Sequence, residues 1–141
     1  MTFQTDTLRR THASLGRTAA LLVETARSFD GLVPHEREAR LAEALRALRD
    51  DVLTHVDLDE AALYPELAEH LDDSLAVAFM RDDHAAIREW IERLVGAGLD
   101  GDPELVVQRL YELHALIALH VRREERLYLS ALEARPRPGE S

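Results

Sequence analysis

Apolar side chains recur along most of the chain at alternating steps of four and three residues. This spacing is typical of one face of an α-helix, because residues three and four apart lie about one turn from each other. It predicts four amphipathic helices, at about residues 5–30, 35–64, 75–96 and 103–134. Each helix therefore has an apolar face, here called its seam, that is suited to packing against the other helices.

Glycine and proline indicate where these helices end. A stop and a restart fall at residues 30–34, and Pro65 is expected to end the second helix, with a helical turn and a loop at 66–73. Residues 96–103 form the clearest loop signal, with Asp102 as the cap of the last helix and proline in its first turn.

Four helices with short connections predict an all-α fold, an antiparallel up-down-up-down four-helix bundle. We expect one domain at residues 1–135, built from two helical hairpins at about 5–72 and 73–135, and a disordered tail at 136–141. The stretch around His12 resembles the stretch around His84, which suggests that the hairpins are duplicates related by a pseudo-twofold axis.

The amino-acid composition excludes several classes of partner and of metal ligand. The net charge of -10 and the absence of a basic stripe argue against a nucleic-acid partner. No segment has the length and apolar character of a membrane span, so no membrane partner and a cytoplasmic location are expected. The chain has no cysteine, which excludes disulfides, thiolate ligands and cysteine nucleophiles. Any metal must therefore be held by imidazole and carboxylate groups.

The seams are apolar except for six side chains, and every helix contributes at least one histidine. These six candidate metal ligands are His12, His55, Asp59, His84, His120 and Glu124. In an antiparallel bundle the four histidines fall in one layer, and each acid follows a histidine by four residues on the same helical face. Such groups are costly to bury unpaired, and a cation offsets that cost. The residues alone leave one or two ions, and iron, zinc, copper or nickel, as alternatives.

This ligand set, in this order on four helices, resembles the hemerythrin-like domain, also called the HHE cation-binding domain, over nearly the whole chain. The run at 59–65 resembles the acidic-acidic-x-x-Leu-aromatic-Pro continuation of that family. The resemblance implies a cofactor of two iron ions with an oxo or hydroxo bridge, which binds or senses dioxygen, peroxide or nitric oxide. It implies that His12 and His55 hold one iron, that His84 and His120 hold the other, and that Asp59 and Glu124 bridge them.

Two departures qualify this assignment. Oxygen-carrying hemerythrins have another histidine four residues after the third-helix histidine, where this chain has Arg88. The bridging acid on the second helix is usually glutamate, and Asp59 is one methylene shorter. Glu60 and Glu125 are accordingly second choices as ligands. Sensing, peroxide or nitric oxide chemistry, or metal handling is therefore expected rather than reversible oxygen carriage.

Other functions stay open at this point. The open position left by Arg88 would suit a peroxide-consuming di-iron enzyme. The short Asp59 would suit a mononuclear iron or zinc protein for storage, delivery or structure. A metal-free interaction module is a further alternative, and the sequence indicates no particular protein partner. Tyr64 is interpreted as an aromatic packing residue, with a hydrogen bond to the acids as the alternative role.

Overall fold

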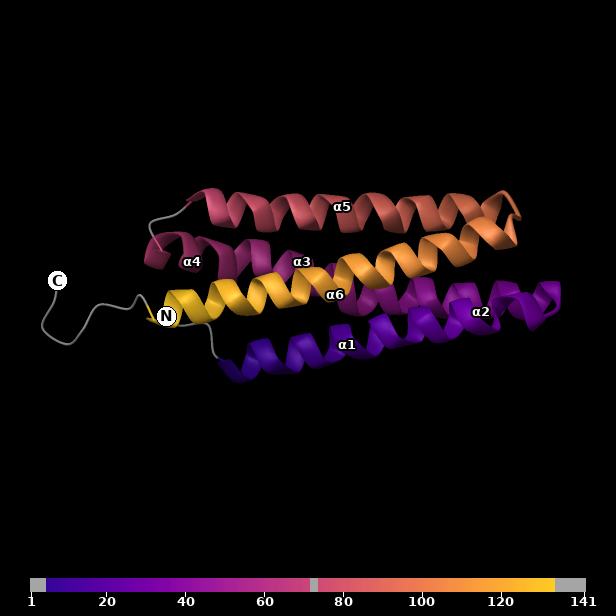
Figure 1. Cartoon of the computed structure of the whole chain (residues 1–141), viewed down its shortest axis with the longest axis horizontal. Coiled ribbons are helices and arrows are strands. Elements are labelled where there is room, and N and C mark those ends of the chain that lie inside the picture. The colour runs from indigo at the N-terminus through magenta and orange to yellow at the C-terminus, as the bar shows by residue number, and fades with distance from the viewer. Residues whose placement is uncertain (1–4, 72–73, 134–141) are drawn as a thin grey trace, which may run out of the picture.

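Four helical rods lie side by side in the computed structural model, which describes residues 5–71 and 74–133 (Figure 1). The second rod is a continuous series of three α-helices and two π-helical segments, whereas each of the other rods contains one long helix. The elements are α1 (Thr5–Ser28), η1 (Phe29–Gly31), α2 (Pro34–Ala47), η2 (Leu48–Leu53), α3 (Thr54–Leu58), η3 (Asp59–Leu63), α4 (Tyr64–Leu71), α5 (Ser74–Leu99) and α6 (Pro103–Glu133).

Neighbouring rods run in opposite directions. The turns from α1 to α2 and from α5 to α6 lie at one end, and the start of α1 and the end of α6 lie at the other (Figure 1). α6 packs against α1 and α5, and the second rod contacts the same two helices from the other side. The predicted all-α, up-down-up-down bundle is therefore confirmed for the described residues, while the expected tail at 136–141 lies outside them.

The start of α6 follows the predicted pattern, but the end of α5 does not. Asp102 caps α6 by accepting a hydrogen bond from the Leu105 N–H at 3.2 Å. The loop prediction is wrong for residues 96–99, because α5 continues to Leu99. A Cβ atom on Gly98 would lie 2.5 Å from Leu41 Cδ2, so glycine permits a close contact between α5 and α2. Packing thus outweighs the low helix propensity of glycine.

The prediction that Pro65 ends the second helix is also wrong. Two π-helical segments, η2 and η3, lie within the rod, and α4 begins directly after η3. A π turn closes from residue i to i+5, so it holds one residue more than an α turn. Pro65 lacks an N–H, and it stands where the regular α-helical ladder is already interrupted. The seam shifts accordingly, so that Ala62 is exposed whereas Leu63 and Tyr64 are buried.

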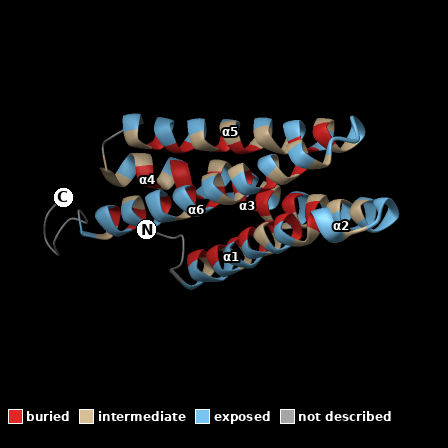
Figure 2. Cartoon of the chain, turned by 45° about the vertical axis from the view of Figure 1, so that its right-hand side comes forward, coloured by how far each residue is buried: buried red, intermediate tan, exposed pale blue. Residues whose placement is uncertain are grey.

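Buried side chains face the interior of all four rods (Figure 2). They form two apolar clusters, here called the large core and the small core. The large core lies toward the α1–α2 and α5–α6 turns and includes Leu15, Leu22, Leu48, Leu94, Leu110, Leu113 and Ile117. The small core lies toward the start of α1 and the end of α6 and consists of Leu8, Leu63, Tyr64, Leu67, Val77, Met80, Tyr128 and Ala131. The six polar seam residues lie where the two cores meet.

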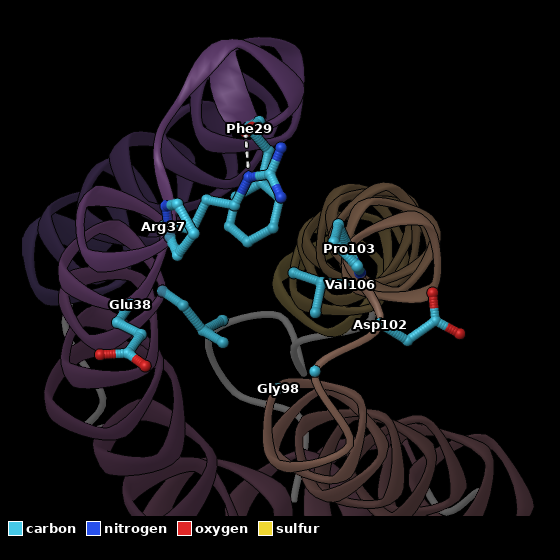
Figure 3. Close-up of a pocket in the computed structure, with 10 residues that line it drawn as sticks. Phe29, Arg37, Glu38, Gly98, Asp102, Pro103 and Val106 are labelled. Atoms are coloured by element: carbon cyan, nitrogen blue, oxygen red, sulfur yellow. Dashed lines mark hydrogen bonds between the residues drawn. The ribbon is translucent and has the colours of Figure 1, made fainter.

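A cavity of about 220 Å³ opens at the end of the large core, among Phe29, Leu41 and Val106 (Figure 3). The Arg37 guanidinium donates a hydrogen bond to the Phe29 carbonyl at 3.0 Å, and the Glu38 carboxylate points away from the opening. This end of the bundle is distant from the polar layer. Within the described residues, no helix combines the length and the apolar character that crossing a membrane requires.

Candidate metal centre

Side chains from all four rods meet in a polar layer at the boundary between the two cores. Its six members are between 0% and 7% exposed: His12, His55, Asp59, His84, His120 and Glu124. The spacing of four residues places each acid beside a histidine of its own rod, at 2.7 Å for His55 Nε2 to Asp59 Oδ2 and 2.9 Å for His120 Nε2 to Glu124 Oε2. The structure thus brings together all six residues that the sequence pattern singles out.

Glu124 is central, because its two oxygens face different histidines. Oε1 lies 2.9 Å from His12 Nε2 and 3.2 Å from His55 Nε2. Oε2 lies 2.9 Å from His120 Nε2 on the other side of the carboxylate. A carboxylate whose oxygens point to two sets of imidazoles has the arrangement needed to bridge two ions.

The second acid and the remaining histidine complete the layer. Asp59 Oδ2 lies 2.7 Å from His55 Nε2 and 3.7 Å from His84 Nε2, so this shorter side chain also reaches one histidine of each pair. The Nε2 atoms of His84 and His120 are 3.0 Å apart. Two nitrogens bound to one ion at about 2.1 Å and at right angles would be separated by roughly 3 Å.

Several of these atoms make no hydrogen bond within the described part of the chain. They are both ring nitrogens of His55 and both carboxylate oxygens of Asp59. The 2.7 Å approach between the two side chains lacks the angles of a hydrogen bond, although the atoms are close. Buried polar atoms of native proteins are nearly always paired, so these four atoms need a partner of another kind. A cation among the converging nitrogens and oxygens provides one, and the residues present therefore fit a metal.

Outer carboxylates bind the Nδ1 atoms of three histidines. His84 Nδ1 lies 3.2 Å from Glu60 Oε1, His120 Nδ1 3.2 Å from Asp83 Oδ2, and His12 Nδ1 3.2 Å from Glu125 Oε1. A carboxylate on Nδ1 fixes the imidazole so that Nε2 points into the layer. Glu60 and Glu125 thus contact the outer side of the histidines rather than converge with the inner atoms.

Arg88 lies outside the layer and contacts Glu60. Its NH1 donates to Glu60 Oε1 at 3.2 Å and its NH2 to Glu60 Oε2 at 3.0 Å. This pairing, together with His84, holds the pKa of Glu60 below its usual value despite partial burial. The residue that stands where oxygen carriers have a histidine therefore acts on an outer carboxylate.

The Tyr64 side chain packs in the small core, as the sequence interpretation preferred, and its hydroxyl also reaches the polar layer, as the alternative role predicted. It donates to Glu124 Oε2 at 2.8 Å and lies 2.9 Å from His84 Nε2 and 3.4 Å from His120 Nε2. Tyr64 follows Asp59 by five residues, which in an α-helix places the two about 140° apart. The π turn of η3 brings them to the same face. The only signal in the sequence was the aromatic residue before Pro65.

Protons on His55, His120 and Asp59 offset the negative charge of the buried carboxylates in the polar layer. Burial would lower the pKa of His55, but Asp59 and Glu124 raise it to about 9. Asp83 and Glu124 likewise raise the pKa of His120 to about 9 against the effect of burial. Burial raises the pKa of Asp59 to about 8. The pKa of Glu124 is lowered by three neighbouring histidines, although burial opposes the shift. A cation entering the layer would displace the protons that these groups hold at neutral pH.

The bundle and its buried histidine-carboxylate layer have the architecture and the ligand types of a helical metal-binding domain. A family model described as the hemerythrin HHE cation-binding domain matches residues 4–132. The chain belongs to this family, as its sequence pattern predicts. No curated protein and no solved structure gives a significant match.

Proposed function

We propose that this protein holds a non-haem di-iron centre that binds or senses dioxygen or a related small ligand, such as peroxide or nitric oxide. The observation that carries the proposal is the position of Glu124, whose two oxygens face different histidines. Membership in a cation-binding family supports the presence of metal. The lack of cysteine leaves only nitrogen and oxygen ligands, which suit iron.

The proposed ligand set divides the layer into two halves. His12 and His55 would hold one ion, His84 and His120 would hold the other, and Asp59 and Glu124 would lie between the two, with Glu60 and Glu125 outside the set. The distances from Glu124 Oε1 to His12 and His55, and from Oε2 to His120, support this division. A pair of iron ions supplies reversible one-electron changes and coordination positions for small oxygen-derived ligands.

Tyr64 gives the second half an additional oxygen. Its side chain is fully buried, and its hydroxyl lies 2.9 Å from His84 Nε2, on the side where a further histidine is absent. The hydroxyl also donates a hydrogen bond to Glu124 Oε2. We therefore assign Tyr64 to the proposed centre, either as a ligand or as a proton donor beside it.

The test is the metal content and visible spectrum of protein purified after growth with iron. We expect about two iron ions per chain and a spectrum that changes on exposure to dioxygen, peroxide or nitric oxide. Glu124→Gln should lose iron, whereas Glu43→Gln, an exposed glutamate on α2, should retain it. Protein without iron, or a spectrum unaffected by all three ligands, would refute the proposal. Turnover of peroxide above that of free iron would instead indicate an enzyme.

A mononuclear iron or zinc site is the second candidate, and one observation favours it. His55, Asp59, His120 and Glu124 each offer a ligand atom, and these four atoms lie within 4.8 Å of one another. Such a group can surround a single ion without the other two histidines. In that case His12→Ala and His84→Ala would both leave one ion bound, whereas a dinuclear centre would lose metal in each variant.

A further inference from the structure

The two halves of the polar layer differ in how their histidines are held from outside. On the His84–His120 side, each Nδ1 atom contacts a carboxylate that is itself bound by an arginine. Glu60 accepts two hydrogen bonds from Arg88, at 3.0 and 3.2 Å. Asp83 accepts one from Arg123 NH1 at 2.9 Å. We call each of these histidine-carboxylate-arginine groups a clip.

Within the part of the chain that the structure describes, the His12–His55 side has no equivalent of a clip. The carboxylate on His12 belongs to Glu125, whose side chain is 53% exposed. Within the described residues no arginine pairs with Glu125, and the Nδ1 atom of His55 has no hydrogen-bond partner. Outer support is therefore strong on one side of the layer and weak on the other.

Both clips have the same construction. His84 and Arg88 lie four residues apart on α5, and His120 and Arg123 lie three apart on α6, so each pair projects from one side of its helix. The carboxylate between them comes from a neighbouring element, Glu60 from η3 in the first clip and Asp83 from α5 in the second. The clips thus link the second rod to α5 and α5 to α6.

A clip acts on the ligand strength of its imidazole. The carboxylate keeps the proton on Nδ1, so the Nε2 lone pair faces the layer and becomes more basic. The arginine fixes the carboxylate in position through charge-assisted hydrogen bonds, at 3.0 and 3.2 Å in the Glu60 clip and at 2.9 Å in the Asp83 clip.

We propose that the His84–His120 position binds its ion more tightly than the His12–His55 position, and that Glu60 and Asp83 are the positioning residues responsible. This inference rests on the proposed metal function. It gives the centre an order of assembly, in which the His84–His120 position fills first and empties last. Removing an outer partner of a metal-bound histidine typically lowers metal affinity by about 10- to 100-fold.

The test follows iron release from the loaded protein into an excess of a coloured iron chelator. We expect a fast and a slow phase, with the fast phase missing in His12→Gln and the slow phase missing in His84→Gln. Asp83→Asn and Glu60→Gln should speed the slow phase by about 10- to 100-fold. The matched control Glu125→Gln removes the outer carboxylate of His12 and should leave the slow phase unchanged.

The possible results separate this inference from the function on which it rests. Wild-type protein that binds no iron would refute both. Iron that leaves in one phase, or a slow phase that responds equally to Asp83→Asn and Glu125→Gln, would refute the order of assembly alone. If the wild type holds a single ion, the inference requires that His12→Gln retain it and that His84→Gln lose it. The opposite result, or retention in both variants as expected for a site of His55, Asp59, His120 and Glu124, would overturn the inference. Should Asp83→Asn fail to fold, Arg123→Met weakens the same clip while keeping the carboxylate.

Discussion

The large core and the small core of the bundle differ in how many apolar side chains they bury. The large core draws on all four rods, and side chains such as Leu22, Leu48, Leu94 and Leu113 are fully buried within it. The small core has about half as many buried apolar residues within the described part of the chain, and both cores border the polar layer. Apolar burial can therefore hold the large core together alone, whereas the small core has less of it to offset the cost of burying the charged and unpaired groups of the layer. If the proposed metal is bound, we expect it to stabilise mainly the small-core end.

Removal of metal should therefore act on one end of the molecule. We expect amides of α4, the start of α5 and the end of α6 to lose protection from hydrogen exchange, by about 4 kcal/mol if free metal stood at a thousand times its dissociation constant. Amides around Leu22 and Leu113 should keep most of their protection. The measurement is hydrogen exchange with and without a chelator, and a uniform loss along the rods would contradict the comparison.

Truncating one buried side chain in each core should then measure how far the two cores differ in their dependence on metal. Leu113→Ala in the large core should cost about 2–5 kcal/mol of unfolding free energy whether or not metal is bound, because a fully buried side chain leaves a cavity. Leu67 in the small core is also fully buried. Leu67→Ala should nevertheless cost less unfolding free energy in protein stripped of metal, because that end of the bundle is already loosened. Denaturant titrations of both variants, with and without chelator, measure the difference. Equal costs in all four experiments would show that the two cores unfold as one.

The pH dependence of stripped protein should report the polar layer. His55 and His120, with pKa values of about 9, and Asp59, with a pKa of about 8, keep protons that the unfolded chain has already released at pH 7. Stability from these groups is present at lower pH and is lost as the pH rises toward 9. We expect the unfolding free energy to fall between pH 7 and 9, by roughly 1 kcal/mol per pH unit for each proton that the folded chain keeps and the unfolded chain has released. Metal should reverse this trend, since its binding releases the same protons.

The smallest effect should come from the Tyr64 hydroxyl. Tyr64→Phe removes the donor to Glu124 Oε2 and should cost about 1–2 kcal/mol in stripped protein, because the buried carboxylate loses a partner. Tyr111→Phe is the matched control, since Tyr111 is 42% exposed and should change stability by less than about 0.5 kcal/mol. Thermal unfolding of both variants makes the comparison, and equal shifts would argue against a role for the hydroxyl.

The helical seams, the antiparallel bundle and the burial of all six polar seam residues could be predicted because each depends on the period of the helix. The end of α5 could not be predicted, because the helical conformation of Gly98 depends on its close contact with Leu41 in another rod. The outer roles of Glu60 and Arg88 likewise depend on the angle between η3 and α5. The two π segments shift by one residue the set of side chains that the second rod turns toward the interior, and no local pattern indicated this shift.

The π turn of η3 makes the position of Tyr64 depend on chain length rather than on residue type alone. Deleting one residue between Asp59 and Tyr64 would allow an ordinary α turn, in which the tyrosine would follow the acid by four residues and lie about 40° from it. The phenol would then stay at the centre, and the residues after it would keep their faces. In an alignment of relatives, a single gap at this point would therefore mark a protein that lacks the π turn but can keep the inward tyrosine. An ordinary α turn without such a gap would instead place the phenol about 140° from the acid and away from the centre. Insertions and deletions in the second helix are thus as informative about the centre as its ligands.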